Sequence, residues 1–190
     1  MKNLLGVVLC GGQSKRMGSD KGLMPVDDTI WAKKVGGKLS ALAIPVVYSI
    51  NETQYELYQQ HVEPQQLIID NAAAAGPLKG LLSVHEKFPE KNLLLMACDM
   101  LDMNKETIEE TLIFYQHEPG YDFYVHQDAE FVQPFCGIYR ATGLAAELAK
   151  AESHQLTKFS MQHLLNGANT KRLPIKDATA FHNYNERIHS

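Results

Sequence analysis

The stretch Leu4–Gly12, LLGVVLCGG, is an aliphatic run that ends directly in a pair of glycines. Its apolar residues do not alternate with polar ones, which is typical of a strand covered on both faces in a parallel sheet. Glycines at the end of such a strand let the backbone approach a ligand closely, so that consecutive N–H groups can converge on an anion. Open parallel sheets bind their ligands at this carboxyl edge. The stretch therefore predicts an α/β fold with an anion site directly after its first strand.

The rest of the chain alternates between short aliphatic runs and segments of helical periodicity. Strands are predicted at Leu4–Cys10, Pro45–Ile50, Gln66–Ile69, Asn92–Cys98, Asp122–His126, Phe131–Tyr139 and Lys171–Ile175. Helices are predicted at Trp31–Ala43, Lys79–Phe88, Lys105–His117, Thr142–Ala151 and Leu156–Asn166, the last closed by Gly167. This order predicts one domain over residues 1–190, a three-layer α/β sandwich around a mostly parallel, Rossmann-like sheet. The pair Asp122–His126 and Phe131–Tyr139 predicts a small antiparallel insertion.

The composition excludes several classes of protein. Of 190 residues, 45% are hydrophobic and 21% are charged, as in soluble globular proteins. With 18 Lys and Arg against 22 Asp and Glu, the net charge is −4, which argues against nucleic-acid and membrane partners because both need cationic faces. No apolar stretch approaches the roughly 20 residues that cross a bilayer, so a cytoplasmic location is expected. The cysteines Cys10, Cys98 and Cys136 are few and lie too far apart in the sequence for a disulfide framework or zinc motif. Cys10 and Cys98 end apolar runs and are expected to be buried.

A cluster of positive charge follows the glycines. Ser14, Lys15, Arg16 and Lys21 supply a hydroxyl and three cations within eight residues. Arg can grip phosphate through two hydrogen bonds, and Lys acts as a point charge. The spacing fits neither the GxGxxG pattern nor the P-loop pattern GxxxxGK[ST]. These residues predict a phosphate site, with a solvated glycine-rich turn as the alternative.

Two aspartates follow predicted strands. Asp99 comes directly after Leu93–Cys98, so its carboxylate is expected at the same edge as Gly11, where it could hold Mg²⁺ or merely terminate the strand. Asp70 follows Leu67–Ile69 and precedes the turn Gly76–Gly80. Its carboxylate is suited to an exocyclic amine or a ribose hydroxyl, although such an Asp is more often a turn residue.

The segment Gly11-Gly12-x-Ser14-x-Arg16-Met17-Gly18-x-Asp20-Lys21 resembles the signature of the molybdenum cofactor guanylyltransferases, the molybdopterin-guanine dinucleotide biosynthesis protein A type with a nucleotidyltransferase A fold. Further matches follow at Asp70 with Gly76-Pro77-Leu78-x-Gly80, at Cys98-Asp99-Met100, at Gln133–Arg140 and at Phe181–Asn185. The resemblance runs from about Leu4 to Asn185. It departs from the family at Leu101, where Pro is usual, and after Asn185, where Glu186–Ser190 replace the usual continuation.

This resemblance implies transfer of GMP from GTP to a molybdopterin phosphate, with Mg²⁺ as cofactor and pyrophosphate as the second product. It implies a GTP site that contains Leu9, Cys10, Gly11, Gly12, Lys21, Asn51, Asp70 and Asp99, with Ser49 as the alternative to Asn51. Arg16, Lys21 and Asp99 would be catalytic, Asp99 would hold the metal, and Asn183 and Asn185 would lie on the acceptor side. Molybdoenzymes or cofactor-insertion proteins would be its protein partners.

Two other functions stay open. One is a related cytidylyl- or nucleotidyltransferase with another acceptor, and the other is a non-catalytic nucleotide-binding interaction module, which the departure at Leu101 keeps in play. Elsewhere, Lys33, Lys34 and Lys38 are predicted to form a solvated helix face, with contact to an acidic partner as the alternative. Asn104 is a predicted N-cap of Lys105–His117, and Asp102 is predicted to cap the same helix or to serve as a second carboxylate.

Overall fold

The computed structural model describes residues 3–11, 20–129 and 131–184. Gly12, Ser14, Lys15, Arg16 and Asn185, which the sequence places at the site, lie outside the described residues.

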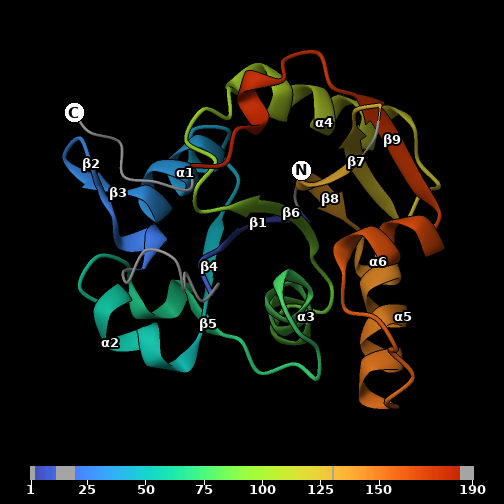
Figure 1. Ribbon diagram of the computed structural model, residues 1–190, viewed down its shortest axis with the longest axis horizontal. Helices are drawn as coiled ribbons and strands as arrows, with labels where there is room; N and C mark the ends of the chain where they lie inside the picture. The colour runs from blue at the N-terminus through green and yellow to red at the C-terminus, as the bar shows by residue number, and fades with distance from the viewer. Residues whose placement is uncertain (1–2, 12–19, 130, 185–190) are drawn as a thin grey trace.

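A seven-stranded sheet in the order β5-β4-β1-β6-β8-β7-β9 forms the centre of the molecule (Figure 1). Its strands are β1 (Leu4–Leu9), β4 (Val46–Ile50), β5 (Leu67–Ile69), β6 (Asn92–Ala97), β7 (Phe123–Gln127), β8 (Val132–Tyr139) and β9 (Thr170–Pro174). All neighbouring pairs are parallel except those that β8 makes with β6 and β7. The predicted α/β class and mostly parallel sheet are therefore confirmed. The expected antiparallel pair forms as β7 and β8, but within the main sheet, and an unpredicted hairpin joins β2 (Pro25–Val26) to β3 (Thr29–Ile30).

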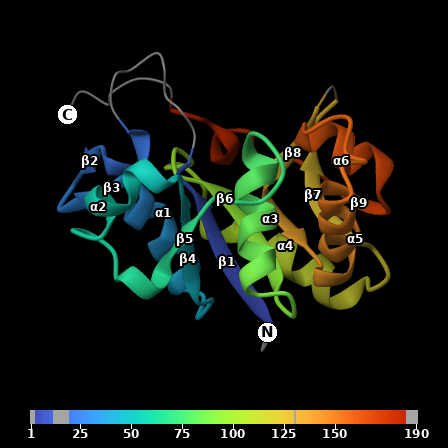
Figure 2. The same cartoon turned by 90° about the horizontal axis from the view of Figure 1, so that it is seen from below.

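Helices cover both faces of this sheet, as Figures 1 and 2 show from two directions. The helices are α1 (Trp31–Ser40), α2 (Tyr55–Tyr58), α3 (Pro77–Lys87), α4 (Lys105–His117), α5 (Ala141–Glu152) and α6 (Met161–Gly167). Apolar residues of α1 and α4 pack into one core cluster, and those of α3, α5 and α6 pack into a second cluster across the sheet. The result is the predicted three-layer sandwich, with each β-strand of the middle of the sheet buried on both sides.

The helix boundaries follow local capping chemistry. The helix α4 begins and ends where the sequence predicts. Its start is set by Asn104, whose side chain accepts a hydrogen bond of 2.9 Å from the Thr107 backbone N–H. The predicted helix Leu156–Asn166 is wrong at its start, because Ser160 caps α6 and the helix begins only at Met161. Gly167 is the last residue of α6 rather than the residue beyond it. Asp102, also predicted as a cap, does not cap α4, because Asn104 fills that role.

Backbone pairing brings four strand ends to one edge of the sheet. The Cys10 N–H donates to the Ser49 carbonyl at 2.8 Å, the Asp70 N–H to the Ile50 carbonyl at 2.8 Å, and the Cys98 N–H to the Leu9 carbonyl at 3.1 Å. Parallel strands in register end together, so the residues that follow β1, β4, β5 and β6 share this carboxyl edge. No helix of the described ranges has the length and apolarity to cross a bilayer.

Candidate active site

An ion pair between Lys21 and Asp99 lies at the carboxyl edge. The Lys21 Nζ is 3.0 Å from the Asp99 Oδ2, although the two residues are 78 positions apart in the sequence. Their side chains are 18% and 14% exposed, so the pair is shielded from bulk water yet open to a ligand. The fold therefore brings the proposed phosphate-binding cation and the proposed metal-binding carboxylate together, as the sequence predicts; their roles toward a nucleotide remain predictions.

The position of Lys21 depends on its neighbour Asp20. Asp20 begins the 3₁₀ helix η1 (Lys21–Leu23), and its Oδ1 accepts hydrogen bonds from the Gly22 N–H at 2.9 Å and the Tyr58 hydroxyl at 3.0 Å. Gln54 donates to the other carboxylate oxygen of Asp20 and, at 3.0 Å, to the Cys10 carbonyl. These contacts join the segment that carries Lys21 to the end of β1 and to α2. Sequence reasoning missed the roles of Gln54 and Tyr58, because both contacts span more than thirty residues.

Asp70 lies in a tight pocket at the same edge. Its Oδ1 accepts a hydrogen bond of 2.6 Å from the Ser49 hydroxyl. Gly11 and Gly80 flank the carboxylate so closely that a methyl group at Gly11 would overlap Asp70 Oδ2, and one at Gly80 would overlap Ser49 Oγ. Burial raises the pKa of Asp70 to about 6, and the Ser49 hydrogen bond and the charge of Lys79 only partly offset it. A partly buried carboxylate that packs closely against two glycines differs from an exposed turn residue, and a contact of Asp70 with a ligand stays a prediction.

Asn51 follows β4 at the carboxyl edge, and its contacts organise a turn. Its side-chain Oδ1 accepts a hydrogen bond of 2.6 Å from the Thr53 hydroxyl, and its N–H donates to Gln54 Oε1 at 2.7 Å. It thereby begins the 3₁₀ helix η2 (Glu52–Gln54). Ser49, the alternative residue of this strand end, is the one that contacts Asp70. A contact of Asn51 with a nucleotide stays a prediction.

Cys10 and Cys98 are buried, as the sequence predicts, and Cys136 is buried as well; all three are free thiols. Burial raises the pKa of the Cys10 thiol well above its ordinary value, and the neighbouring Cys98 thiol raises it further. The Cys10 thiol is therefore a neutral group, and both cysteines belong to the apolar core beneath the carboxyl edge. Cys10 can contribute to a ligand site through its backbone, as Leu9 and Gly11 can.

The loop that carries Asp99 is held from two sides. The Tyr184 N–H donates to the Asp99 carbonyl at 3.3 Å, and its hydroxyl donates to Asp102 Oδ2 at 2.7 Å. From α1, the ammonium of Lys38 donates to the carbonyls of Leu101 and Met103. The prediction that Lys38 belongs to a solvated face is therefore wrong, because its side chain turns toward this loop, whereas Lys33 and Lys34 are exposed. Figure 2 shows the segment after β9, in red, returning to this edge. Asn183 is exposed and precedes Tyr184, and its place on the acceptor side stays a prediction.

The residues at this edge fit a magnesium ion that arrives with its substrate. No group of three or more His, Cys, Asp or Glu side chains gathers anywhere in residues 3–11, 20–129 and 131–184. Mg²⁺ is commonly held by one or two carboxylates together with substrate phosphates and water, rather than by a cage of protein ligands. A single partly shielded carboxylate, Asp99, beside a lysine meets that requirement.

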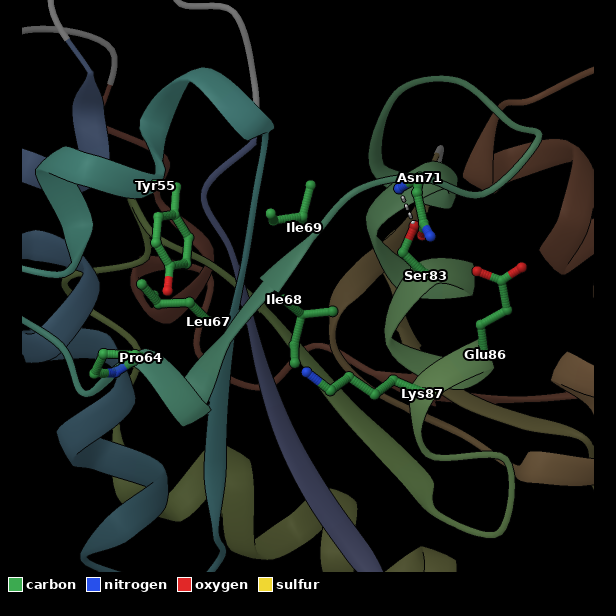
Figure 3. Close-up of a pocket in the computed structure, with 9 residues that line it drawn as sticks. All are labelled: Tyr55, Pro64, Leu67, Ile68, Ile69, Asn71, Ser83, Glu86 and Lys87. Atoms are coloured by element: carbon green, nitrogen blue, oxygen red, sulfur yellow. Dashed lines mark hydrogen bonds between the residues drawn. The ribbon is translucent and has the colours of Figure 1, made fainter.

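A separate hollow of about 650 Å³ lies at the edge strand β5, away from the Lys21–Asp99 pair (Figure 3). The side chains of Tyr55, Pro64 and Leu67 lie on one side of the strand and those of Ser83, Glu86 and Lys87 on the other. The hollow contains none of the predicted site residues. The candidate site is therefore the carboxyl edge, where the charged and close-packed groups converge.

A parallel sheet whose carboxyl edge joins a glycine-ended strand, an Asp–Lys pair and a partly buried Asp defines an α/β protein with a candidate ligand site at that edge. Residues 6–168 match the family described as the MobA-like NTP transferase domain, and the chain belongs to that family of nucleotidyltransferases. It is 31% identical over 141 residues to a probable molybdenum cofactor guanylyltransferase of Trichormus variabilis. This alignment covers 74% of this chain and 67% of that protein.

Two further comparisons agree with this family. The chain is 28% identical over 145 residues to the molybdenum cofactor biosynthesis bifunctional protein of a Synechocystis strain. This alignment covers 76% of this chain and 41% of that protein. It therefore spans less than half the length of that relative. The crystal structure of molybdopterin-guanine dinucleotide biosynthesis protein A from Archaeoglobus fulgidus superposes with a TM-score of 0.76 at 21% identity, over 95% of this chain and 91% of the other. That likeness establishes the shared fold.

Proposed function

We propose that this chain transfers GMP from GTP to the phosphate of molybdopterin and releases pyrophosphate, with Mg²⁺ as the metal. The Lys21–Asp99 pair at the carboxyl edge carries the proposal, because it supplies a cation for phosphate and a carboxylate for a metal at one place. The relatives named as a molybdenum cofactor biosynthesis protein and a probable molybdenum cofactor guanylyltransferase support molybdopterin as the acceptor and guanine as the base.

The proposed reaction needs no covalent enzyme intermediate. An oxygen of the pterin phosphate attacks the α-phosphorus of GTP in line, the bond from that phosphorus to the bridging oxygen breaks, and pyrophosphate leaves with its electron pair. The protein contributes positioning and charge stabilisation. Lys21 neutralises charge on the phosphates, together with Arg16, and the backbone of Leu9, Cys10, Gly11 and Gly12 cradles the nucleotide. When bound at Asp99, Mg²⁺ would neutralise the phosphate charge that develops on the leaving group.

Asp70 is the proposed contact for a donor group of the nucleotide. Above its pKa of about 6 the carboxylate is ionised and accepts hydrogen bonds only. One oxygen is engaged by Ser49, and the other faces Gly11 at the end of β1. An acceptor in this pocket matches the exocyclic amine of guanine or a ribose hydroxyl. Asn183, with Asn185, is the proposed contact on the acceptor side.

A nucleotide panel tests the proposal. The melting temperature of the wild-type chain is measured with GTP, CTP, ATP and UTP, each with and without Mg²⁺, and turnover is measured with GTP and molybdopterin. A ligand at a hundred times its Kd adds about 2.7 kcal/mol, so binding is readily visible. We expect stabilisation by GTP in the presence of Mg²⁺ and release of pyrophosphate. A preference for CTP would move the assignment to the cytidylyltransferase alternative, and binding of GTP without turnover would favour the interaction module.

Variants of the ion pair test the roles of its two members. Lys21→Ala and Asp99→Asn are each expected to lower kcat about 10²–10³-fold, the usual cost of removing one group that stabilises transition-state charge. Lys105→Ala, which removes the lysine of an exposed ion pair with Glu109, is the matched control and should leave turnover unchanged. Wild-type turnover in a folded Asp99→Asn protein would contradict the proposed metal site.

A further inference from the structure

Lys38 is a lysine of α1 whose ammonium reaches the loop that carries Asp99. Its Nζ donates to the Leu101 carbonyl at 2.9 Å and to the Met103 carbonyl at 2.8 Å, across 63 and 65 positions of sequence. Both carbonyls lie in the segment between β6 and α4, two and four residues after Asp99. One side chain therefore spans the part of the loop that follows the proposed metal-binding carboxylate.

Several backbone bonds also fix the course of this loop in the described part of the chain. Strand pairing ends at Ala97, and two turns follow, with the Met100 N–H 3.2 Å from the Ala97 carbonyl and the Met103 N–H 3.3 Å from the Met100 carbonyl. The bond from Tyr184 to the Asp99 carbonyl is also 3.3 Å long. The two bonds from Lys38 are shorter than these backbone bonds and are charge-assisted, as is the 2.7 Å bond from the Tyr184 hydroxyl to Asp102. Bonds of that kind are roughly twice as strong as neutral ones.

The surroundings of Lys38 show that this contact has a cost. Burial lowers the pKa of the Lys38 ammonium, the charge of Lys34 lowers it further, and the carboxylate of Asp102 opposes the shift. A lysine that served only solubility would point into water, as the exposed Lys33 does on the same helix. The two carbonyls and Asp102 together offset the partial desolvation of the Lys38 ammonium.

We propose that Lys38 is a positioning residue for the transfer reaction, which fixes the loop Cys98–Met103 so that the Asp99 carboxylate faces Lys21 and the bound phosphates. The inference rests on the proposed function, because it assigns Lys38 its effect through Asp99. Lys38 touches neither reacting group; it acts on the backbone that presents one of them.

The test compares Lys38→Met, Lys38→Arg and the control Lys33→Met with the wild-type chain. Methionine keeps the length of the side chain without its charge, and arginine keeps a charge with several donors. Binding of Mn²⁺ in the presence of GTP is followed by the electron paramagnetic resonance of the free ion, and kcat and KM are measured in parallel. Loss of a residue that orients a metal ligand typically costs about 10–100-fold in affinity or activity.

For Lys38→Met we expect Mn²⁺ affinity and kcat to fall at least tenfold while the KM for GTP changes less than threefold. Lys38→Arg should recover most of both losses, and Lys33→Met should match the wild type. Amide hydrogen exchange at Met100–Met103 should be at least tenfold faster in Lys38→Met alone.

Wild-type Mn²⁺ affinity and kcat in a Lys38→Met protein with faster loop exchange or a lowered melting temperature would overturn the inference and leave Lys38 a structural residue. If the wild-type chain bound no metal-dependent GTP, the proposed function would fail first, and the role of Lys38 with it. Hydrogen exchange would still report whether Lys38 holds the loop, so the two failures are distinguishable.

Discussion

Asp70 is a carboxylate whose surroundings disfavour its own charge. Burial raises its pKa from 3.8 to about 6, so the unfolded chain ionises at a lower pH than the folded chain does. Ionisation of Asp70 therefore costs the folded state no stability below about pH 4. The cost grows as the pH rises toward 6 and is complete above it. A group that costs stability at neutral pH is characteristic of a functional site.

Asp70→Asn removes that charge while its amide oxygen can still accept the Ser49 hydrogen bond. We expect this variant to be more stable than the wild type at pH 7.5 by on the order of 2 kcal/mol, and equal to it near pH 4. Urea denaturation at several pH values measures the difference. Parallel stability curves between pH 4 and 8 would show that Asp70 ionises as freely in the folded chain as in the unfolded one. The same variant should bind GTP more weakly, since it gives up the acceptor for a guanine amine.

At the scale of one element, α1 contains two adjacent glycines that have different roles. A methyl group at Gly36 would overlap the hydroxyl of Tyr48 on β4, so Gly36 lets the helix approach the sheet. A methyl group at Gly37 would meet no atom within 4 Å, and Gly37 is exposed. The sequence shows only that both lower helix propensity; the sheet beneath decides which one is needed.

The two glycines give a matched pair of variants. Gly37→Ala should raise the free energy of unfolding by about 0.5–1 kcal/mol, because alanine favours helix and restricts the unfolded chain. Gly36→Ala should lower it, because Tyr48 or the helix must shift. Thermal and urea unfolding of both variants measure the difference, and equal effects would contradict the packing of α1 on β4.

The elements themselves were predictable where a local signal specifies them. Aliphatic runs located β1 and β6, and Asn104 located the start of α4, because each depends on neighbours in the sequence. The start of α6 was missed because Ser160 offers a cap inside what otherwise reads as a periodic helix. Lys38 was misplaced because its spacing from Lys34 fits an exposed face, and its two acceptors lie more than sixty residues away.

The same difference between local signals and long-range contacts applies to the candidate site. The sequence placed Lys21, Asp70 and Asp99 at one sheet edge, because each follows or lies near the end of a parallel strand. It did not indicate that Lys21 and Asp99 would pair directly, nor that Gln54 and Tyr58 would hold Asp20. Those contacts depend on how loops from different strands meet, which no short window of sequence contains.

At the scale of the whole molecule, Asn92 joins both helical layers at the edge of the sheet opposite the site. Its Oδ1 accepts a hydrogen bond of 2.9 Å from the Ala141 N–H at the start of α5, and its side-chain amide donates to the Tyr115 hydroxyl of α4 at 2.6 Å. About 20 Å of strand separates it from Asp99. Stability and ligand binding are therefore expected to be separable in this fold.

Asn92→Ala tests that separation. It should lower the free energy of unfolding by about 1–3 kcal/mol, because it leaves a helix N–H and a tyrosine hydroxyl without their partner. The rise in melting temperature on addition of GTP and Mg²⁺ should match the wild type. A large loss of that rise would mean that the two edges of the sheet are coupled.

The contact between Tyr184 and Asp99 has a consequence for the order in which the chain folds. The central strand β1 pairs with β4 and β6, so it stays without its sheet partners until residues near 50 and 97 have been synthesised. The Asp99 loop receives its last backbone bond only when residue 184 arrives, long after the strands around it exist. On the ribosome, at about 5–20 residues per second, several seconds separate the two events. When the interval begins, the nascent chain contains the strands β1, β4, β5 and β6, whose ends form the carboxyl edge, but its Asp99 loop lacks the bond to Tyr184. The candidate site is therefore completed after the strands that carry it.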